Sequence, residues 1–306
     1  MDRFEAIEAF VAAVEGGSLS AASRALNTPL PTISRRVSEL EAHLNAQLLV
    51  RTSRKLILTE AGEAFAAAAR RLLDDLAEAE RAASGEYRAP RGELLVTAPI
   101  MFGKLHVAPI VHAFLAAYPE VTVRLVLSDD VIDLIEAHVD VAVRIGRLAD
   151  SELIARQVGH VRWLICASPD YLAQRGEPAT PEALRDHVCI AFEGLRDYRD
   201  WDFGRGAAAR SVTIRPRFSV NTAEAVAEAA AAGIGVAQLM SYQAAQAIAQ
   251  GRITTILREF GDEAMPVHLV HQSQRIQPLK RRAFLDFVTP RLTQALIEVE
   301  TKVRSA

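Results

Sequence analysis

One stretch of this chain, residues 31–44, constrains the fold more than any other. It reads Pro-Thr-Ile-Ser-Arg-Arg-Val-Ser-Glu-Leu-Glu-Ala-His-Leu. Apolar side chains recur in it with spacings of four, three and four residues, at Ile33, Val37, Leu40 and Leu44. This spacing predicts a helix that buries one stripe. Pro31 suits the first position of that helix, because an N–H there would have no partner within the helix.

The opposite face of this helix is polar. With the stripe buried, the outward and flanking positions are Thr32, Ser34, Arg35, Arg36, Ser38 and Glu39. Residues 18–59 carry six Arg and Lys residues against two Glu residues, whereas the whole chain has a formal net charge of −3. A local cationic patch on an otherwise acidic protein is expected where a surface faces DNA phosphates. We therefore predict that this helix binds DNA.

Two helices are expected before this stretch. The first covers about Arg3 to Glu15 and ends at Gly16-Gly17. Its apolar face is expected to hold Phe4, Ile7, Phe10, Val11 and Val14. The second covers about Leu19 to Leu26, with Ser18 as its N-cap. Two helices joined by a short turn, with the second one basic on its exposed face, form a helix-turn-helix.

A wing is expected after the helix-turn-helix. Residues 48–59 form two short apolar runs around a polar tip, which predicts a β-hairpin, and Asn45 suits the left-handed position that ends the preceding helix. Arg51, Arg54 and Lys55 would then lie near the DNA backbone or minor groove. The alternative is that these cations belong to an ordinary solvated loop.

A long helix follows, from the predicted N-cap Thr59 to about Glu86. Its apolar seam comprises Phe65, Ala68 or Ala69, Leu72, Leu73, Leu76, and Ala79 or Ala83. A long helix with one narrow seam favours pairing with a second copy of itself. The alternative is packing against its own chain. Residues 87–92 contain Pro90 and Gly92 and are expected to form a hinge.

Strands and helices alternate beyond Gly92. The expected strands are Leu94–Ala98, Val121–Leu127, Val139–Ile145, Val161–Ala167, Cys189–Phe192, Val212–Ile214, Gly235–Leu239 and Val267–His271. The expected helices are Phe102–Tyr118, Val131–Ala137, Pro169–Arg175, Pro181–Leu184, Thr222–Ala232, Ser241–Ala249 and Leu279–Lys302. This alternation predicts largely parallel sheets covered on both faces. Two such halves would leave a cleft between them.

Several motifs together resemble the LysR-type transcriptional regulator family along essentially the whole chain. They are Phe10-Val-Ala-Ala-Val14, Gly17-Ser-Leu-Ser-Ala-Ala22, Ala25-Leu26, Pro31-Thr-Ile-Ser-Arg35, Leu40-Glu41, Leu48-Leu49 with Arg51, Leu58-Thr-Glu-Ala-Gly62, Gly233-Ile-Gly235 and Arg282-Ala-Phe284. The resemblance implies an α/β protein with an all-α winged helix-turn-helix domain, a long linker helix that dimerises, and a two-lobed effector domain like a periplasmic binding protein. It also implies a tetramer made of two dimers.

The resemblance further implies that Pro31, Thr32, Ser34 and Arg35 face the operator, with Arg51 at the wing. Our other DNA-binding candidates are Ser18, Arg36, Ser38, Arg54 and Lys55. The chain departs from the family pattern at Pro29-Leu30, where the family often has Ser-Gln, and at Asn45 and Leu49, where Gly and Phe are usual. Leu30 has no polar group for a base or phosphate. The departure shifts base recognition towards Thr32, Ser34 and Arg35.

The effector-binding candidates lie at turns from strands into helices, where free N–H groups favour a carboxylate. They are Pro99, Ile100, Met101, Phe102, Gly103, Arg144, Ile145, Gly146, Asn221 and Thr222, with Arg147 as an alternative cation. The first turn is apolar, so polar recognition is assigned to Asn221, Thr222 and Arg144 or Arg147. The alternatives are that Met101 and Phe102 are core residues and that Arg144 and Arg147 are surface cations.

Other classes of protein fit less well. An enzyme is disfavoured because His268 and His271 point to opposite faces of one strand, and no nucleophile elbow or phosphate-binding loop is present. We expect neither a cofactor nor a metal. Cys166 and Cys189 are interpreted as reduced core thiols, with a redox pair as the alternative. A solute-binding protein lacks support because the N-terminus is no signal peptide, and a DNA-binding repressor without a functional effector site stays open.

The predicted domains are residues 1–59 for the winged helix-turn-helix, 60–91 for the linker helix and hinge, and 92–306 for the effector domain. Within the last, lobe I is about 92–164 and 268–306, and lobe II about 165–267. No window approaches the run of about 18 apolar residues that spans a membrane, so we expect a cytoplasmic protein. The expected partners are an interrupted two-fold DNA operator, a small effector such as an organic acid, further copies of the chain, and RNA polymerase.

Overall fold

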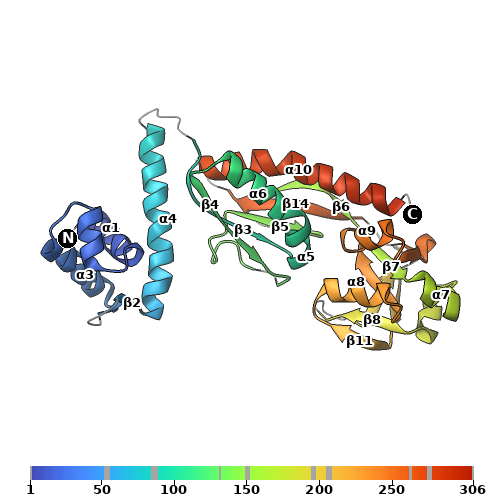
Figure 1. The fold of residues 1–306 in the computed structure, drawn as a ribbon. Coiled ribbons are helices and arrows are strands. Elements are labelled where there is room, and N and C mark those ends of the chain that lie inside the picture. The colour runs from blue at the N-terminus through green and yellow to red at the C-terminus, as the bar shows by residue number, and fades with distance from the viewer. Residues whose placement is uncertain are drawn as a thin grey trace. The chain divides into compact units, whose positions relative to one another are not determined.

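The structure is a computed structural model that describes residues 2–51, 56–83, 89–130, 132–148, 152–193, 198–204, 209–261, 264–273 and 278–304. The chain forms two compact units, Met1–Gly92 and Glu93–Ala306 (Figure 1). Arg54 and Lys55, two of the DNA-binding candidates, lie outside the described residues.

The first unit is a winged helix-turn-helix followed by a long helix. Its elements are α1 (Arg3–Glu15), α2 (Leu19–Ala25), α3 (Leu30–Leu44), β1 (Leu49–Arg51), β2 (Leu56–Leu58) and α4 (Glu60–Ala83). The wing is an antiparallel pair with Val50 opposite Ile57. These elements confirm the expected helices and hairpin, and Ser18 and Asn45 act as the predicted N-cap of α2 and left-handed C-cap of α3.

The buried stripe of α3 is shorter than expected. Ile33, Val37 and Leu40 are buried, but Leu44 is 38% exposed. Leu44 is the last residue of α3, and the packed stripe ends one turn earlier. Phe4 was also expected in the core but is half exposed. The face of α1 that packs on the core carries Ala6, Ala9 and Phe10.

The start of α3 differs from the expectation by one residue. The helix begins at Leu30, so Pro31 occupies its second position and Pro29 is the N-cap. Pro29 has no side-chain cap, and its carbonyl accepts hydrogen bonds from the N–H groups of Thr32 at 2.9 Å and Ile33 at 3.1 Å. Pro29 therefore fixes the φ angle where the helix begins. Pro31, in the second position, has no N–H group, so no backbone donor is left unpaired there.

The start of α4 is built into the wing. Thr59 accepts a hydrogen bond from the Gly62 N–H at 3.0 Å and donates one to the Gln47 carbonyl at 2.6 Å. A Cβ atom at Gly62 would lie 2.0 Å from the Leu48 carbonyl oxygen, so only glycine allows this close approach. Thr59 is thereby confirmed as the N-cap of α4.

The seam of α4 is only partly buried within its own unit. Phe65, Ala66, Ala69 and Leu73 pack on the core of the first unit, with the ring of Phe65 5.5 Å from that of Phe10. The alternative of packing against its own chain is therefore confirmed for this part of the seam. Leu72 is 46% exposed and remains available to another copy of the chain.

The second unit contains two five-stranded sheets. The first sheet has the strand order β4-β3-β5-β14-β6, from β3 (Gly92–Ala98), β4 (Val121–Leu127), β5 (Val141–Ile145), β6 (Leu153–Val161) and β14 (Met265–Gln272). The second has the order β11-β8-β12-β7-β13, from β7 (Trp163–Ala167), β8 (Cys189–Phe192), β11 (Pro216–Val220), β12 (Val236–Met240) and β13 (Thr254–Ile256). A ribbon of β9 (Asp200–Phe203) and β10 (Arg210–Thr213) accompanies the second sheet.

Helices cover these sheets. Those of the first lobe are α5 (Ile100–Phe102), the π-helical turn η1 (Gly103–Val107), α6 (Ala108–Ala117) and α10 (Leu279–Arg304). Those of the second are α7 (Pro169–Arg175), α8 (Ala223–Ala231), α9 (Ser241–Ala249) and the 3-10 turns η2 (Pro181–Asp186) and η4 (Arg258–Phe260). α10 runs along the first sheet beside α6 and also contacts α9 of the second lobe (Figure 1).

The expectation of largely parallel sheets was wrong in detail, because both sheets are mixed. β3 and β5 are parallel, but β14 runs antiparallel to β5 and β6. In the second sheet β8 is parallel to β11 and β12, while β7 is antiparallel to β12 and β13. The chain leaves the first sheet and returns to it as β14, and the returning strand runs in the opposite direction to its neighbours.

Four strands, β6, β9, β11 and β13, were not among the expected strands. β6 lies at the edge of its sheet and exposes four successive residues, Ile154–Gln157, so it lacks the buried apolar pattern of a central strand. The helix expected at Val131–Ala137 does not form among its described residues. Residues 134–138 form turns, and the Asp133 carboxylate accepts hydrogen bonds from the N–H groups of Ile135 and Glu136.

One segment, Ile100–Ala117, is long and apolar enough to span a membrane by length and composition, so the expectation that no window approaches this limit was wrong. In the structure it comprises α5, η1 and α6. Its large apolar side chains Phe102, Val107 and Phe114 are fully buried in the core of the second unit. Ile100 and Leu105 of the same segment are exposed, so packing in that core explains only part of its apolar character.

Candidate nucleic-acid interface and effector region

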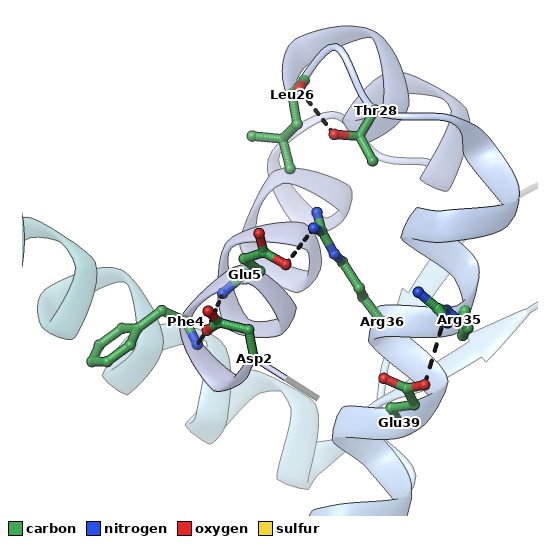
Figure 2. Close-up of polar contacts among 8 residues, drawn as sticks. All are labelled: Asp2, Phe4, Glu5, Leu26, Thr28, Arg35, Arg36 and Glu39. Carbon is green, nitrogen blue, oxygen red and sulfur yellow. Dashed lines mark hydrogen bonds and ion pairs between the residues drawn. The ribbon is translucent and has the colours of Figure 1, made fainter.

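The turn between α2 and α3 is held by its own hydrogen bonds. The Ser23 hydroxyl donates to the Thr28 carbonyl at 2.7 Å, and the Thr28 N–H donates to the Ser23 carbonyl at 3.0 Å. The Thr28 hydroxyl donates to the Leu26 carbonyl at 3.1 Å (Figure 2). Asn27 takes a left-handed conformation with φ 48°. These bonds fix the angle at which α3 leaves α2.

Arg35 is the most available cation on α3. Its side chain is 70% exposed and lies 3.9 Å from the carboxylate of Glu39, one turn further along the helix (Figure 2). An exposed ion pair with this spacing contributes only a few tenths of a kcal/mol. Arg35 can therefore exchange Glu39 for a phosphate or a base edge at little cost.

Arg36 has a different environment from its neighbour. Its guanidinium forms an ion pair with Glu5 of α1, and its side chain is only 21% exposed (Figure 2). Arg36 is one of the DNA-binding candidates, but its ion pair directs the guanidinium towards α1. The two residues are 31 positions apart, and no local pattern links them.

The other candidates of this interface differ in exposure. Pro31 and Ser38 are exposed, whereas Ser18, Thr32 and Ser34 are partly buried. The Ser18 hydroxyl accepts a hydrogen bond from the Ala21 N–H at 3.1 Å, which is the N-cap bond of α2. Arg51 is the last residue of β1.

Glu41 joins α3 to the wing. Its carboxylate accepts hydrogen bonds from the N–H groups of Leu48 at 2.8 Å and Leu49 at 3.0 Å. Two charge-assisted bonds from one rigid helix set the position of β1 relative to α3. Leu40-Glu41 was noted in the sequence as a family motif, but this contact was not foreseen.

In the second unit, the first candidate effector turn precedes α5. Ile100 is exposed, and its N–H donates to the Asp129 carboxylate at 3.0 Å. Phe102 is fully buried and Met101 packs against the same core, so the alternative of core packing is confirmed for both. A Cβ at Gly103, where η1 begins, would lie 2.2 Å from the end of the Leu127 side chain, so a larger residue there would displace that side chain. Because Asp129 already occupies an N–H of this turn, a ligand carboxylate there would meet a negative charge.

The second candidate group is at the end of β5. The Arg144 guanidinium donates to the Ile132 carbonyl at 2.7 Å, and partial burial lowers the pKa of Arg144. Ile145 pairs with Val267 in the sheet, and Gly146 has φ 107° while its N–H donates to the Pro266 carbonyl at 2.9 Å. Arg144 is therefore half-buried and bonded to the backbone, unlike an ordinary surface cation.

The third candidate group precedes α8. Asn221 and Thr222 are exposed, and Thr222 is the N-cap of α8 but makes no side-chain cap hydrogen bond. Close by, the Lys104 amine of η1 lies 2.8 and 3.0 Å from the two carboxylate oxygens of Glu224 on α8. This ion pair links the two lobes, and its members are 120 residues apart, so sequence analysis did not find it.

A small aromatic cluster lies behind this ion pair. The ring of Phe102 is 5.0 Å from His106 and 5.1 Å from Tyr242 of α9. Burial, with a smaller contribution from the charge of Lys302, lowers the pKa of His106 to about 4. The His106 Nε2 atom is buried and has no hydrogen-bond partner among the residues that the structure describes. His106 is therefore neutral at pH 7.

Within the described residues no group of three or more His, Cys, Asp or Glu residues is placed to hold a metal ion. Cys166 and Cys189 are buried free thiols, and burial raises the pKa of each to about 12. The interpretation of both as core thiols is confirmed. Gly233 follows Ala232, the C-cap of α8, and takes a left-handed conformation with φ 76°.

Comparison with known proteins agrees with these two units. The model "Bacterial regulatory helix-turn-helix protein, lysR family" matches residues 4–63, and the model "LysR substrate binding domain" matches residues 88–293. An "HTH-type transcriptional regulator" of Xanthomonas campestris pv. campestris is 34% identical, over 92% of this chain and 83% of that protein. CrgA of Neisseria meningitidis serogroup C, also named an HTH-type transcriptional regulator, is 34% identical, over 94% and 96% of the two chains.

Two solved structures are similar along the whole chain. The structure of Neisseria meningitidis CrgA, described as a LysR-type transcriptional regulator, has a TM-score of 0.61 and 34% identity, covering 94% of this chain and 98% of that one. The full-length structure of the Vibrio cholerae virulence activator AphB has a TM-score of 0.59 and 31% identity, covering 93% and 97%.

Proposed function

Because the chain belongs to the LysR family of DNA-binding transcriptional regulators, we propose that α3 enters the major groove of each half of an interrupted, two-fold-symmetric operator. The observation that carries this proposal is the outward face of α3. It presents the exposed Arg35, Pro31 and Ser38 on a helix whose opposite side is buried. A helix held rigidly on one side and polar on the other fits the geometry of major-groove recognition.

Arg35 is the proposed base-reading residue. Arginine recognises guanine through two hydrogen bonds in the major groove, and this needs a side chain free to extend from the helix. Its exposed position and its weak contact with Glu39 support this role. Thr32 and Ser34 flank Arg35 as the other proposed contacts to bases or phosphates.

Arg36 receives a different role in this proposal. Its ion pair with Glu5 positions α3 against α1, so Arg36 supports recognition from behind the helix. Ser18 supports the interface in the same indirect way as the N-cap of α2. The phosphate contacts are assigned to the wing, through Arg51, Arg54 and Lys55, with α3 and β1 held together by Glu41.

In the second unit we propose that a small organic acid binds between the turn before α8 and the elements α5 and η1. Thr222 is the N-cap residue of α8 but makes no side-chain cap hydrogen bond, so its hydroxyl and the N–H groups of the first turn of α8 can bind a carboxylate. Asn221 lies beside it in the chain. Asp129 at the start of α5 disfavours an anion on that side, so the apolar part of the effector is assigned to Ile100 and Met101. Pro99, Phe102, Gly103, Arg144, Ile145 and Gly146 then shape the region without being the main polar contacts.

The assembly follows from the same family membership. We propose that α4 pairs with α4 of a second copy through Leu72, that two dimers form a tetramer, and that the tetramer acts in the cytoplasm with RNA polymerase. It acts on transcription without catalysing a reaction.

The second candidate function is a repressor without a working effector site. The hydrogen bond from the Arg144 guanidinium to the Ile132 carbonyl favours this alternative, because it engages a candidate effector contact.

A binding assay tests the DNA proposal. Fluorescence anisotropy of the full chain with a duplex taken from the DNA upstream of its own coding sequence should show tight binding that weakens steeply as salt rises. A random duplex of the same length should bind more weakly by about 1000-fold or more. Equal affinity for both duplexes would overturn the proposed base reading.

A thermal-shift screen separates the two candidate functions. A small carboxylic acid that binds only the folded state raises its melting temperature. The Thr222→Ala variant should reduce that shift, whereas a repressor without an effector site would show no shift with any acid tested.

A further inference from the structure

A cavity lies in the second unit, and it is lined by residues other than the effector candidates discussed above. It has a volume of about 400 Å³, within the range of small-molecule sites. Its floor is a row of three neighbouring side chains, Gln238 on β12, Ile165 on β7 and Ile256 on β13, which lie directly opposite one another in the sheet. None of the ten effector candidates lines this cavity.

The walls of the cavity are flat and apolar. Trp163 of β7, Phe203 of the β9–β10 ribbon and Phe260 of η4 line it together with the buried Leu257. Side chains of this kind form a slot suited to a planar, apolar body.

The rim of the cavity is cationic. Arg162, Arg258 and Arg304 line it, against the single carboxylate of Asp202. Glu300 on α10 pairs with Arg162, and its carboxylate lies 3.8 Å from Arg304, so it neutralises part of this charge. Within the described part of the chain, Arg258 donates to the Thr255 carbonyl at 3.3 Å, through one of its five N–H groups.

One polar group reaches the floor. The partly buried side chain of Gln238 lies at one end of this row, beside Ile165, and lines the cavity. Its amide can both donate and accept hydrogen bonds. It provides a second fixed polar contact, opposite the arginine rim.

We propose that this cavity binds an aromatic monocarboxylate. The ring would lie on Ile165 and Ile256 between the aromatic walls, with the carboxylate at Arg258 and Arg304 and a polar ring substituent at Gln238. Arginines at the mouth and apolar walls inside select a flat organic anion over a sugar or a bulky polar molecule.

The position of the cavity links it to both connections between the lobes. Arg162 is the one residue between β6 of the first lobe and β7 of the second, and its carbonyl accepts a hydrogen bond from the Ser241 N–H at 2.7 Å. Leu257–Gly261 lead from β13 towards β14, back in the first lobe. An occupant touches both connections, so it favours one relative arrangement of the lobes and acts as a second input to the sensing unit.

The chain provides its own reporter for a test, because it has two tryptophans and one of them, Trp163, lines the cavity. The probe is 4-nitrobenzoate, which quenches tryptophan fluorescence, and the control is 4-nitrobenzamide, with the same ring and no charge. In the full-length Trp201→Phe variant, 4-nitrobenzoate should quench Trp163 saturably, and the amide should bind about tenfold more weakly or worse. If Trp201→Phe fails to fold by circular dichroism, the unmodified chain is compared with Trp163→Phe, which should lose the saturable component.

Two further variants locate the site. Arg258→Gln combined with Arg304→Gln should weaken 4-nitrobenzoate binding about tenfold, while Arg282→Gln, at an exposed arginine of α10 that does not line the cavity, should leave it unchanged. Equal quenching by acid and amide, unsaturable quenching, or no effect of the arginine variants would overturn the proposal. None of these results depends on DNA binding, so this proposal and the proposed function fail separately.

Discussion

The adjacent residues Arg35 and Arg36 allow a sharp test of the interface, since the structure gives them different environments and we propose different roles for them. Replacing Arg35 by alanine removes an exposed side chain whose contact with Glu39 is 3.9 Å long, so we expect the free energy of unfolding to change by less than about 0.5 kcal/mol. If Arg35 reads a base with two hydrogen bonds, the same change costs about 1–3 kcal/mol of specific binding per half-site.

Replacing Arg36 by alanine should have the reverse effect. It breaks the ion pair with Glu5, whose partners are 21% and 51% exposed, and also removes a partly buried stem. We expect a loss of about 1 kcal/mol of stability. Because Arg36 faces α1, the ratio of specific to random DNA affinity should stay within about twofold of the unmodified chain.

Two measurements separate these outcomes. Urea denaturation at fixed protein concentration gives stability, with Glu5→Ala and the double variant completing a cycle for the Arg36–Glu5 pair. Fluorescence anisotropy with upstream and random duplexes at one salt concentration gives the specificity ratio. The assignment would be refuted if Arg35→Ala kept the ratio and Arg36→Ala lost it, or if the cycle showed no coupling between Arg36 and Glu5.

Three other changes test different parts of the structure. Gly62→Ala places a Cβ 2.0 Å from the Leu48 carbonyl, so it should cost about 1–3 kcal/mol in urea denaturation, while Glu63→Ala on the exposed face should be near neutral. Leu72→Lys together with Leu76→Lys should leave a monomer by light scattering; a chain that stayed dimeric would refute the role of α4. The lowered pKa of His106 means that the unfolded state takes up its proton first, so stability should fall as pH drops from about 6.5 to about 4, and His106→Leu should flatten that fall in the denaturation midpoint.

The helices of the first unit were predictable because their signals are local. The stripe of Ile33, Val37 and Leu40 and the caps at Ser18 and Thr59 each lie within a few residues of the structure that they determine. The exceptions are at helix ends, where Phe4 and Leu44 lie beyond the packed core. Periodicity identifies the side of a helix that is buried but not where the neighbouring surface stops.

The second unit was less predictable because its sheets depend on pairings between distant segments. β6 is an edge strand with an exposed central stretch, and β14 joins the first sheet after the chain has passed through the second lobe. Neither the direction of β14 nor its neighbours follows from its own residues. The mixed order of both sheets could therefore not be read from the alternation of strands and helices.

The site residues show the same difference between local signals and contacts with distant segments. Exposure of Arg35 followed from the helix period, but the partner of Arg36 is 31 residues away and that of Lys104 is 120 residues away. The hydrogen bond from the Ile100 N–H to Asp129, which further supports Thr222 as the proposed carboxylate position, depends on a contact between two loops. The cavity lined by Trp163, Gln238 and Arg258 is assembled from strands with no shared motif.

The central claim is that the outward face of α3 lies on base pairs, and site-directed cleavage of DNA tests it directly. Both native cysteines are buried, so a Ser38→Cys variant can carry an iron chelate at one exposed position of α3. On the bound upstream duplex we predict strand cleavage in two short clusters, one in each half of the operator. Intact DNA at these positions, under conditions where the labelled chain still binds the duplex, would contradict the account.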